Sequence, residues 1–326
     1  MAEMITIGEP MVLFASDDPD VPLAQADHYS KYSAGAELNV AVGVARLGHR
    51  VEYASMVGID PLGEYLVHEI KQNKIGTDYL DRDPNHWTGF YLKQLVTDAD
   101  PDIFYFRKDS AASHFDAQIL SRINFTNLKI AHLSGIFAAL SDNNLAVFKQ
   151  INNLMLQKNV TVTFDPNLRP SLWRNESEMI ETTNDLAKNA HIVMPGLSEG
   201  RILTRFASPE DIAGFYLSQS KITNTVIIKL GENGAFIMKR NGYSATVSGY
   251  QIDRVVDTVG AGDGFVAGIL TALLEDQSIE NAVKRGCAVG AMAVMSPGDN
   301  DGYPTVEQLT TFLASHSGGR VTNEKS

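Results

Sequence analysis

The stretch DTVGAGDGFVAGIL, residues 257–270, decides the fold of this chain. Gly260, Gly262 and Gly264 stand at alternate positions, Asp263 lies between the last two, and small and apolar residues follow. This pattern predicts a glycine-rich turn that opens a helix, where free backbone N–H groups attract anions. Asp263 then either caps the helix or faces a hydroxyl beside the bound anion.

The second arrangement suits phosphoryl transfer, because N–H groups hold the phosphate while a carboxylate accepts the proton of the attacking hydroxyl. A position at the positive end of a helix predicts a low pKa for Asp263, and hence a weak base. A weak base is sufficient when the transferred group passes through a loose transition state that releases the proton late.

Outward from this stretch, segments with strand and helix patterns alternate along the chain. Strands are expected at 4–8, 50–58, 130–135, 160–167 and 190–196, and within 225–239 two strands flank a Gly-Glu-Asn-Gly turn. Helices are expected at 36–48, 61–74, 143–159, 263–276 and 279–295. This alternation predicts an α/β fold with a mainly parallel sheet covered by helices on both faces.

Two segments, about 10–33 and 87–108, interrupt the alternation. The second has the pattern of two strands around an Asp-rich turn, with aromatic residues at alternating positions. We expect a separate small sheet that acts as a lid over a site, as an oligomer contact, or as both. The length predicts one large domain, residues 1–315, that carries this lid, and the polar segment 316–326 predicts a flexible tail.

Composition excludes several classes of partner. Acidic residues outnumber basic ones by 39 to 27, for a formal net charge of −12, and no stripe of Lys or Arg appears. Nucleic acid and an anionic membrane are therefore not expected as partners. The single cysteine, Cys287, excludes a disulfide within the chain, and no apolar run reaches about 18 residues, so a cytoplasmic location is expected. The sequence contains no P-loop and no set of spaced metal ligands.

The segment DTVGAGDGFVAG (257–268) closely resembles the C-terminal signature of the ribokinase-like, or PfkB, carbohydrate kinases. The segments GEPMV (8–12), SAGAELNVAVGVARLG (33–48) and VGIDPLG (57–63) are similar to that family's first strand, sugar-binding motif and Asp-containing loop. The resemblance covers nearly the whole chain. It implies a ribokinase-like three-layer sandwich with a small β-sheet lid, and a homo-oligomer of two or more copies formed through the lid strands. It also implies ATP and Mg²⁺ as cofactors and leaves a monovalent cation open.

By this resemblance Asp263 is the catalytic base, and the N–H groups of Gly260, Ala261 and Gly262 form an anion hole. Where the sugar motif of the family begins with two glycines, this chain has Ala34 and Gly35, which tightens the expected sugar pocket.

The Asn-x-x-Glu motif of the family aligns with residues 196–199, where Gly196 replaces the Asn. Glu199 is implied as a ligand of Mg²⁺ through bound water, and Ser198 as a contact of a phosphate. The segment IKLGENGA (228–235) implies a nucleotide site that contains Lys229, Gly231 and Gly234, together with Gly262. Spacing alone favours a simple hairpin turn there. The helix around Cys287 and Ala288 either packs beside the adenine or belongs only to the core.

Four segments resemble those of family members that phosphorylate 2-keto-3-deoxygluconate: 35–43, 88–93, 104–113 and 165–173. The implied contacts to sugar hydroxyls are Gly35, Ala36 and Asn39. Those to the acid end are Tyr91, Tyr105, Arg107 and Arg169. The chemistry suits these side chains, because a guanidinium holds a carboxylate with two hydrogen bonds and a tyrosine offers an apolar face and a hydroxyl. Strand packing for the tyrosines and ordinary ion pairs for the arginines remain as alternatives.

The sequence therefore predicts an enzyme that transfers phosphate from ATP to the C6 hydroxyl of 2-keto-3-deoxygluconate, in sugar-acid breakdown. A kinase for another sugar, such as fructose or ribose, is the first alternative, and a non-catalytic sensor of sugar acids is the second. The gluconate-derived and galactonate-derived epimers of the substrate are not distinguished by residue types.

Overall fold

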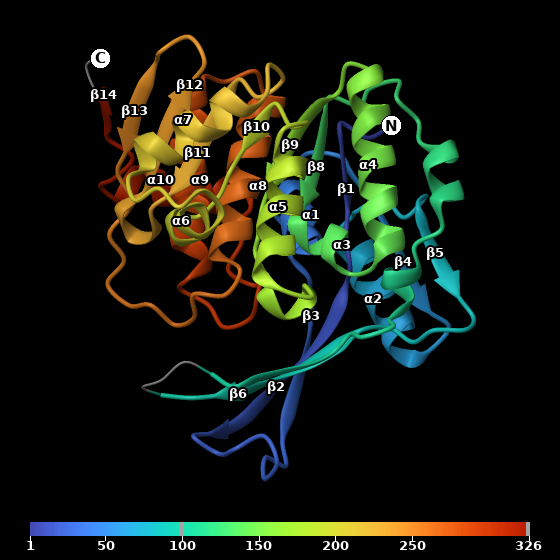
Figure 1. Ribbon diagram of the computed structural model, residues 1–326. Coiled ribbons are helices and arrows are strands. Elements are labelled where there is room, and N and C mark those ends of the chain that lie inside the picture. Colours follow the sequence, from blue (N-terminus) through green and yellow to red (C-terminus); the bar gives the residue numbers. More distant parts are fainter. Residues whose placement is uncertain (98–100, 324–326) are drawn as a thin grey trace.

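The computed structural model describes residues 1–97 and 101–323. Its main sheet contains ten strands: β1 (Met4–Ile7), β4 (Val51–Gly58), β5 (Leu80–Asp83), β8 (Ile130–Ser134), β9 (Thr161–Asp165), β10 (Ile192–Val193), β11 (Thr225–Lys229), β12 (Ala235–Lys239), β13 (Ser244–Val247) and β14 (Val321–Asn323). Their order is β14-β13-β12-β11-β10-β9-β8-β1-β4-β5, as Figure 1 shows. Neighbours from β5 to β11 are parallel, and β12, β13 and β14 continue the sheet in antiparallel pairs.

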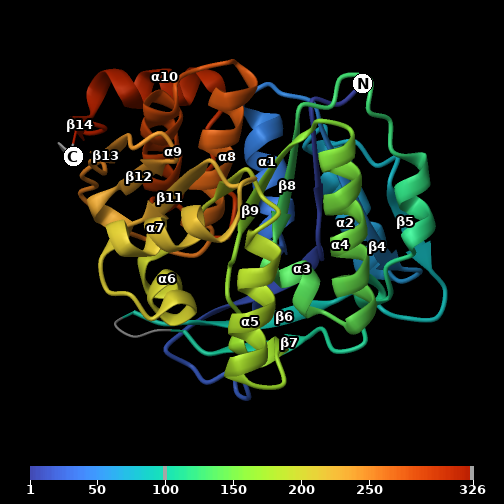
Figure 2. The same ribbon diagram turned by 45° about the horizontal axis from the view of Figure 1, so that its top comes forward.

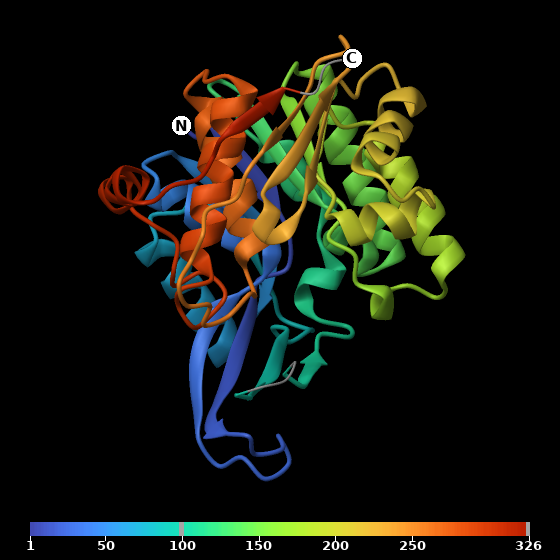
Figure 3. The same ribbon diagram turned by 90° about the vertical axis from the view of Figure 1, so that its left-hand side faces the viewer.

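Two layers of helices enclose this sheet. One layer holds α1 (Ala36–Arg46), α2 (Pro61–Gln72), α8 (Ala261–Leu274) and α9 (Ile279–Ala293), and α10 (Val306–Ser315) packs outside α9. The other holds α3 (Gly135–Ala139), α4 (Asp142–Gln157), α5 (Glu176–Ala187), α6 (Leu197–Thr204) and α7 (Pro209–Gln219). Figure 3 shows the sheet between the layers, and Figure 2 shows α10 beyond α9. The α/β three-layer arrangement expected from the sequence is confirmed.

Burial on both faces explains the composition of the central strands. All four residues of β1 and all five of β8 are buried, as expected for strands that helices cover on both sides. A separate apolar core fills each interface between sheet and helices. In one of them α8 and α9 approach closely, because a Cβ on Gly268 would lie 2.8 Å from the Cα of Gly286.

A second sheet projects from the body of the molecule as the lid (Figure 1). It consists of β2 (Met11–Pro19), β3 (Tyr29–Ala34), β6 (Phe90–Leu95) and β7 (Ile103–Phe106), in the order β3-β2-β6-β7. Strands β2 and β6 are parallel and the outer pairs are antiparallel, so the lid is a mixed sheet. The separate small sheet expected from the sequence is confirmed. Part of its Asp-rich turn, residues 98–100, lies outside the described residues.

Alternation along the lid strands separates two faces. Met11, Leu13, Ala34 and Tyr91 form a buried cluster, so Ala34 of the altered sugar motif is a core residue of the lid. Phe104 and Phe106, two residues apart on β7, are 60% and 41% exposed. The lid therefore has a packed side and an exposed aromatic side.

The C-terminal segment differs from the expected tail. Residues 321–323 form the edge strand β14, paired with β13, and residues 324–326 lie outside the described residues. Among the described residues, no helix is both long enough and apolar enough to cross a membrane.

Candidate active site

Two cavities meet at the N-terminus of α8. The smaller, about 300 Å³, lies between the lid and the main sheet, and the larger, about 870 Å³, lies between the β11–β12 loop and helices α8 and α9. Lys229, Thr258 and Gly262 line both cavities. The glycine-rich turn is therefore the place where a molecule in one cavity would touch a molecule in the other.

The turn requires glycine at its first position. Gly260 precedes α8 with φ of 78°, and a Cβ there would lie 1.7 Å from the carbonyl oxygen of Asp299. This left-handed conformation allows the next residues to begin a 14-residue helix with N–H groups that have no intrahelical partner. The helix dipole adds positive potential at the same point, so the turn is suited to an anion.

Asp263 does not act as the cap of α8. Its carboxylate accepts hydrogen bonds from the side-chain amides of Asn39 (2.9 Å) and Asn167 (3.3 Å). Asn39 in turn accepts a hydrogen bond of 2.8 Å from Asn300, so a chain of amides orients the carboxylate. Of the two arrangements considered for Asp263, the one in which it faces the cavity agrees with this geometry, because Asp263 lines the smaller cavity.

The low pKa expected for Asp263 is wrong. Burial, the largest effect, raises its pKa to about 7, and the negative charge of Asp165 acts in the same direction. The hydrogen bond from Asn39 and the charges of Arg169 and Lys229 lower it, but they do not compensate for burial. The helix dipole does not set this pKa, because the carboxylate is packed between the amides of Asn39 and Asn167 and has lost part of its water.

Parallel strands bring a buried ion pair to the same edge of the sheet. Asp165 ends β9 and Lys229 ends β11, and their side chains are joined by a hydrogen bond of 2.6 Å. Burial lowers the pKa of Lys229, but the adjacent charges of Asp165 and Glu199 outweigh it and hold the pKa above its usual value. Lys229 therefore stays charged beside the turn, at the carboxyl edge where α/β sheets bind ligands.

The lid supplies one wall of the smaller cavity. Tyr91 is 4% exposed, and its hydroxyl donates a hydrogen bond of 2.8 Å to Oδ2 of Asp299. The Tyr105 ring packs on that of Tyr91, with 5.1 Å between centroids. Oδ1 of Asp299 is buried and has no hydrogen-bond partner among the described residues. An unpartnered buried oxygen in a cavity wall is a ready acceptor for a ligand hydroxyl.

The two arginines of the cavity differ in their charge balance. The guanidinium of Arg107 pairs with buried Glu9, with 2.8 Å between Nε and Oε2. Arg169 donates to the carbonyl of Leu168 at 2.9 Å and forms no ion pair within residues 1–97 and 101–323. Both line the cavity, but of the two only Arg169 has no carboxylate in ion-pair contact among the described residues.

Glu199 is held by the backbone. Its two oxygens accept hydrogen bonds of 2.7 Å from the N–H groups of Gly196 and Leu168. Ser198 is exposed in the first turn of α6, outside the described lining of either cavity. The structure therefore does not bring Ser198 and Glu199 into direct contact with the cavities.

The larger cavity has a mixed lining. Lys229, Gly231 and Gly234 line it from β11 and the loop that follows, and Phe265, Cys287 and Val294 line it from the region of α8 and α9. The Gly231–Asn233 segment joins the antiparallel strands β11 and β12, so it is a hairpin loop. The same loop lines the larger cavity, so the two predictions for this segment are compatible. Burial raises the pKa of Cys287 to about 12, so this thiol is an apolar wall group.

Most of the residues predicted from sequence come together here. The smaller cavity is lined by Gly35, Ala36, Asn39, Tyr91, Tyr105, Arg107, Arg169, Gly260, Gly262 and Asp263, and the larger by Lys229, Gly231, Gly234, Ala261 and Gly262. Sequence reasoning missed Lys93, Asn167, Thr258 and Asp299. Lys93, Asn167 and Thr258 lie inside or beside the quoted segments, and Asp299 follows a Pro-Gly pair that is a typical turn signal.

Comparison with known proteins agrees with this geometry. A family model described as pfkB family carbohydrate kinase matches residues 1–306. The chain is 41% identical over 313 residues to a 2-dehydro-3-deoxygluconokinase of Bacillus subtilis, an alignment that covers 96% of this chain and 95% of that protein.

Solved structures share the fold. A PfkB protein from Polaromonas sp. JS666 is 38% identical with a TM-score of 0.85, covering 95% of this chain and 99% of that one. A fructokinase double mutant from Vibrio cholerae O395, solved with fructose, ADP and potassium, is 27% identical with a TM-score of 0.83, covering 96% and 98%. A candidate ribokinase II from E. coli in complex with ATP and Mg²⁺ is 24% identical with a TM-score of 0.86, covering 97% and 100%.

Proposed function

This chain belongs to the pfkB family of carbohydrate kinases, and on that premise we propose that it phosphorylates the C6 hydroxyl of 2-keto-3-deoxygluconate. 2-Keto-3-deoxygluconate is another name for 2-dehydro-3-deoxygluconate, the compound in the name of the Bacillus subtilis relative. The product would be 2-keto-3-deoxy-6-phosphogluconate. The observation that carries the substrate class is the uncompensated guanidinium of Arg169 in the same cavity as Asp263.

The cavity matches the chemistry of a sugar acid. A hexulosonate has one carboxylate, and a guanidinium binds such a group with two parallel hydrogen bonds. Arg169 is suited to bind that carboxylate. Arg107 is already paired with Glu9, so it contributes more to the shape of the cavity than to its positive charge. Oδ1 of Asp299 offers an acceptor for a ligand hydroxyl, and the Tyr91 hydroxyl, whose hydrogen is donated to Oδ2 of Asp299, offers a second acceptor between the two ends. The reacting hydroxyl would then lie at Asp263.

The chain's own residues account for the transfer. Asp263 accepts the proton of the hydroxyl, whose oxygen attacks the γ-phosphorus as the bond to ADP breaks. The N–H groups of the Gly260–Gly262 turn and the ammonium of Lys229 stabilise charge on the phosphoryl oxygens. The lid excludes water, which reduces hydrolysis of ATP in place of transfer.

ATP and Mg²⁺ are part of the proposal. The larger cavity joins an apolar pocket to the anion-binding turn, which matches a nucleotide base and its phosphates. Mg²⁺ binds hard oxygen ligands and keeps several waters. Glu199 fits a water-mediated role, because each of its oxygens accepts one backbone N–H and retains a further lone pair. When bound, Mg²⁺ neutralises phosphate charge.

The test is an assay of ADP release with Mg·ATP and four acceptors: 2-keto-3-deoxygluconate, its galactonate epimer, fructose and ribose. We expect turnover concentrated on the keto-deoxy acids and a loss of about 10³-fold or more in Asp263→Asn. Arg169→Gln should raise KM for the acid by about tenfold or more, and Arg107→Gln should have the smaller charge-dependent effect.

Each other result leads to a different assignment. Turnover on a neutral sugar would support kinase activity but would contradict the assignment of Arg169 as the residue that binds a substrate carboxylate. Tight binding of the acid without turnover would make the protein a sensor of sugar acids.

The lid also supports a proposal about the assembly of the protein. Edge strand β7 exposes Phe104 and Phe106, a pair of rings 5.1 Å apart, on the side away from the cavity. We propose that this face associates with a second copy of the chain, because exposed aromatic edges on soluble proteins mark interfaces.

We also propose a cytoplasmic location. The use of ATP and a single unpaired cysteine both support it.

A further inference from the structure

Lys93 lies where the lid meets the glycine-rich turn. It follows Tyr91 by two residues on β6, so both side chains face the body of the protein. Lys93 is 8% exposed, and its ammonium forms an ion pair with the carboxylate of Asp257. An ammonium so well buried is held by its partner and exchanges little with solvent.

Asp257 belongs to the segment that leads into the turn. Its Oδ1 accepts a hydrogen bond of 3.0 Å from the N–H of Val259, the residue before Gly260. The N–H groups of Val256 and Asp257 donate to the carbonyl of Val294, at 2.7 and 3.3 Å. One oxygen of Asp257 therefore shapes the turn, and the other holds the lid.

The charges around Lys93 make its position necessary for anion binding. Asp257 and Asp299 both face it from the body, and Tyr91 and Tyr105 flank it from the lid. Without the ammonium, two carboxylates would stand beside the turn that receives phosphate oxygens. Like charges so close would repel a phosphate and would also repel each other.

We propose that Lys93 is a positioning residue that acts through Asp257: its ammonium fastens the closed lid to the anion-binding turn and neutralises the acidic group behind that turn. The proposal rests on the proposed kinase function. It gives the lid a second task besides covering the sugar, since the phosphate site is complete only with the lid in place. It also makes the ammonium of Lys93 an internal monovalent cation, so the wild-type protein should need no added potassium.

The experiment compares Lys93→Ala, Lys93→Arg and Asp257→Asn with Lys31→Ala. Lys31 is the other lysine of the lid strands, and it is exposed on β3. We expect Lys93→Ala to lower kcat by about tenfold or more, with KM for the sugar acid changed by less than about threefold. Lys93→Arg should restore most of kcat, and Lys31→Ala should match the wild type.

Chemical rescue tests the role of the cation directly. Ammonium or potassium chloride at about 0.1 M should recover a large part of the lost kcat in Lys93→Ala, because a small cation fills the space beside Asp257. The same concentration of N-methylglucamine chloride, whose cation is too large, should not. The wild type should respond to none of the three salts. If Lys93→Ala does not fold, judged by circular dichroism, Lys93→Met keeps the stem without the charge.

A binding measurement separates this inference from the choice of substrate. Calorimetry should show that Lys93→Ala lowers the ratio of affinities for a non-hydrolysable ATP analogue over ADP by about tenfold, with no sugar present. That result would stand even if no sugar acid were turned over by the wild type. A raised KM for the acid with unchanged kcat would instead make Lys93 a direct substrate ligand, and an unchanged affinity ratio would overturn the proposal.

Discussion

Asp263 shows how the environment of one residue changes its chemistry. At the start of a helix an exposed aspartate is a weak base, yet burial raises the pKa of this one to about 7. The amide of Asn39 opposes that shift by donating to the ionised form. In the proposed reaction the base would therefore titrate near neutral pH, where proton transfer by a general base is most effective.

The pH profile follows from this value. Asp263 acts as a base only when ionised, so kcat/KM should be constant above about pH 7 and fall tenfold per unit well below it. Asn39→Ala removes a hydrogen bond that lowers the pKa, so it should move the acid limb to higher pH. Rates from pH 5.5 to 9 test both statements. A profile that stays flat down to pH 5.5 would mean that Asp263 is not the group being titrated.

Gly260 and Gly214 form a matched pair for substitution by alanine. Gly260→Ala should abolish most of the activity, because its φ is 78° and the new Cβ would overlap the carbonyl of Asp299. Gly214 lies inside α7 with nothing within 4 Å of a Cβ, so Gly214→Ala should stabilise the protein by about 0.5–1 kcal/mol. Activity and the midpoint of urea denaturation distinguish the two. Equal activities would show that the turn is not strained.

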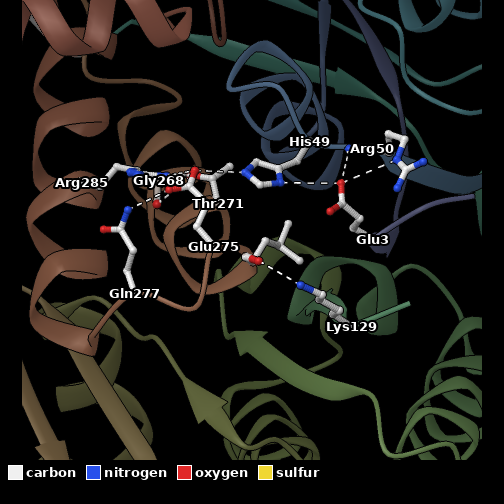
Figure 4. Close-up of polar contacts among 10 residues, drawn as sticks. Glu3, His49, Arg50, Lys129, Gly268, Thr271, Glu275, Gln277 and Arg285 are labelled. Atoms are coloured by element: carbon white, nitrogen blue, oxygen red, sulfur yellow. Dashed lines mark hydrogen bonds and ion pairs between the residues drawn. The ribbon is translucent and has the colours of Figure 1, made fainter. Parts of the chain in front are cut away.

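At the scale of elements, a polar cluster joins segments at the edge of the sheet where α8 ends (Figure 4). Glu275, the residue after α8, accepts two hydrogen bonds from Arg285 of α9, at 2.6 and 2.7 Å, and pairs with His49 after α1. Lys129, just before β8, donates to the carbonyl of Leu274 at 3.1 Å. These contacts satisfy the C-terminus of α8 and fix the helix whose other end borders the candidate active site.

Glu275→Gln should therefore reduce the free energy of unfolding by about 1 kcal/mol at pH 7, a value limited by the partial exposure of the carboxylate. The hydrogen bond from Arg285 lowers the pKa of Glu275 to about 2. A folded pKa below the unfolded one stabilises the protein above pH 4.5, the usual pKa of a glutamate, and this stabilisation is lost as pH falls toward 2. Urea denaturation at pH 7, 5 and 3 should show the difference between variant and wild type shrinking only at pH 3.

At the scale of the whole molecule, the lid serves two surfaces at once. Residues alternate along β7, so Tyr105 faces the cavity while Phe104 and Phe106 face outward. In the proposed assembly, the lid would then contact the smaller cavity with one face and a second copy of the chain with the other. Assembly and catalysis would share one four-stranded sheet.

The double variant Phe104→Ser/Phe106→Ser should shift the protein toward the monomer, because it removes the apolar outer face without touching Tyr105. Sedimentation velocity at several concentrations measures the shift. Ile202→Ser, an exposed apolar residue on α6 away from the lid, is the control. If the wild type is already monomeric, the proposal that the lid forms an interface between copies of the chain is wrong.

Much of the fold and the site follows from local sequence. The alternation of strand and helix patterns predicts the parallel sheet, and the spacing of Gly260, Gly262 and Asp263 predicts a helix start with an acidic side chain. These features depend on residues near one another in the chain, so a short pattern contains them. The interruption of that alternation predicts the small separate sheet, and the resemblance of longer segments to a known family then points to the sugar-side residues.

Only the tertiary structure decided the properties that arise from distant segments. The pKa of Asp263 depends on burial, on the charge of Asp165 and on Asn39, which is 224 residues away in sequence. The pairing of Arg107 with Glu9, which leaves Arg169 as the uncompensated charge, joins segments 98 residues apart. Lys93 and Asp257 meet across 164 residues. Burial and charge compensation are sums over neighbours in space, and the order of residues along the chain does not state which neighbours those are.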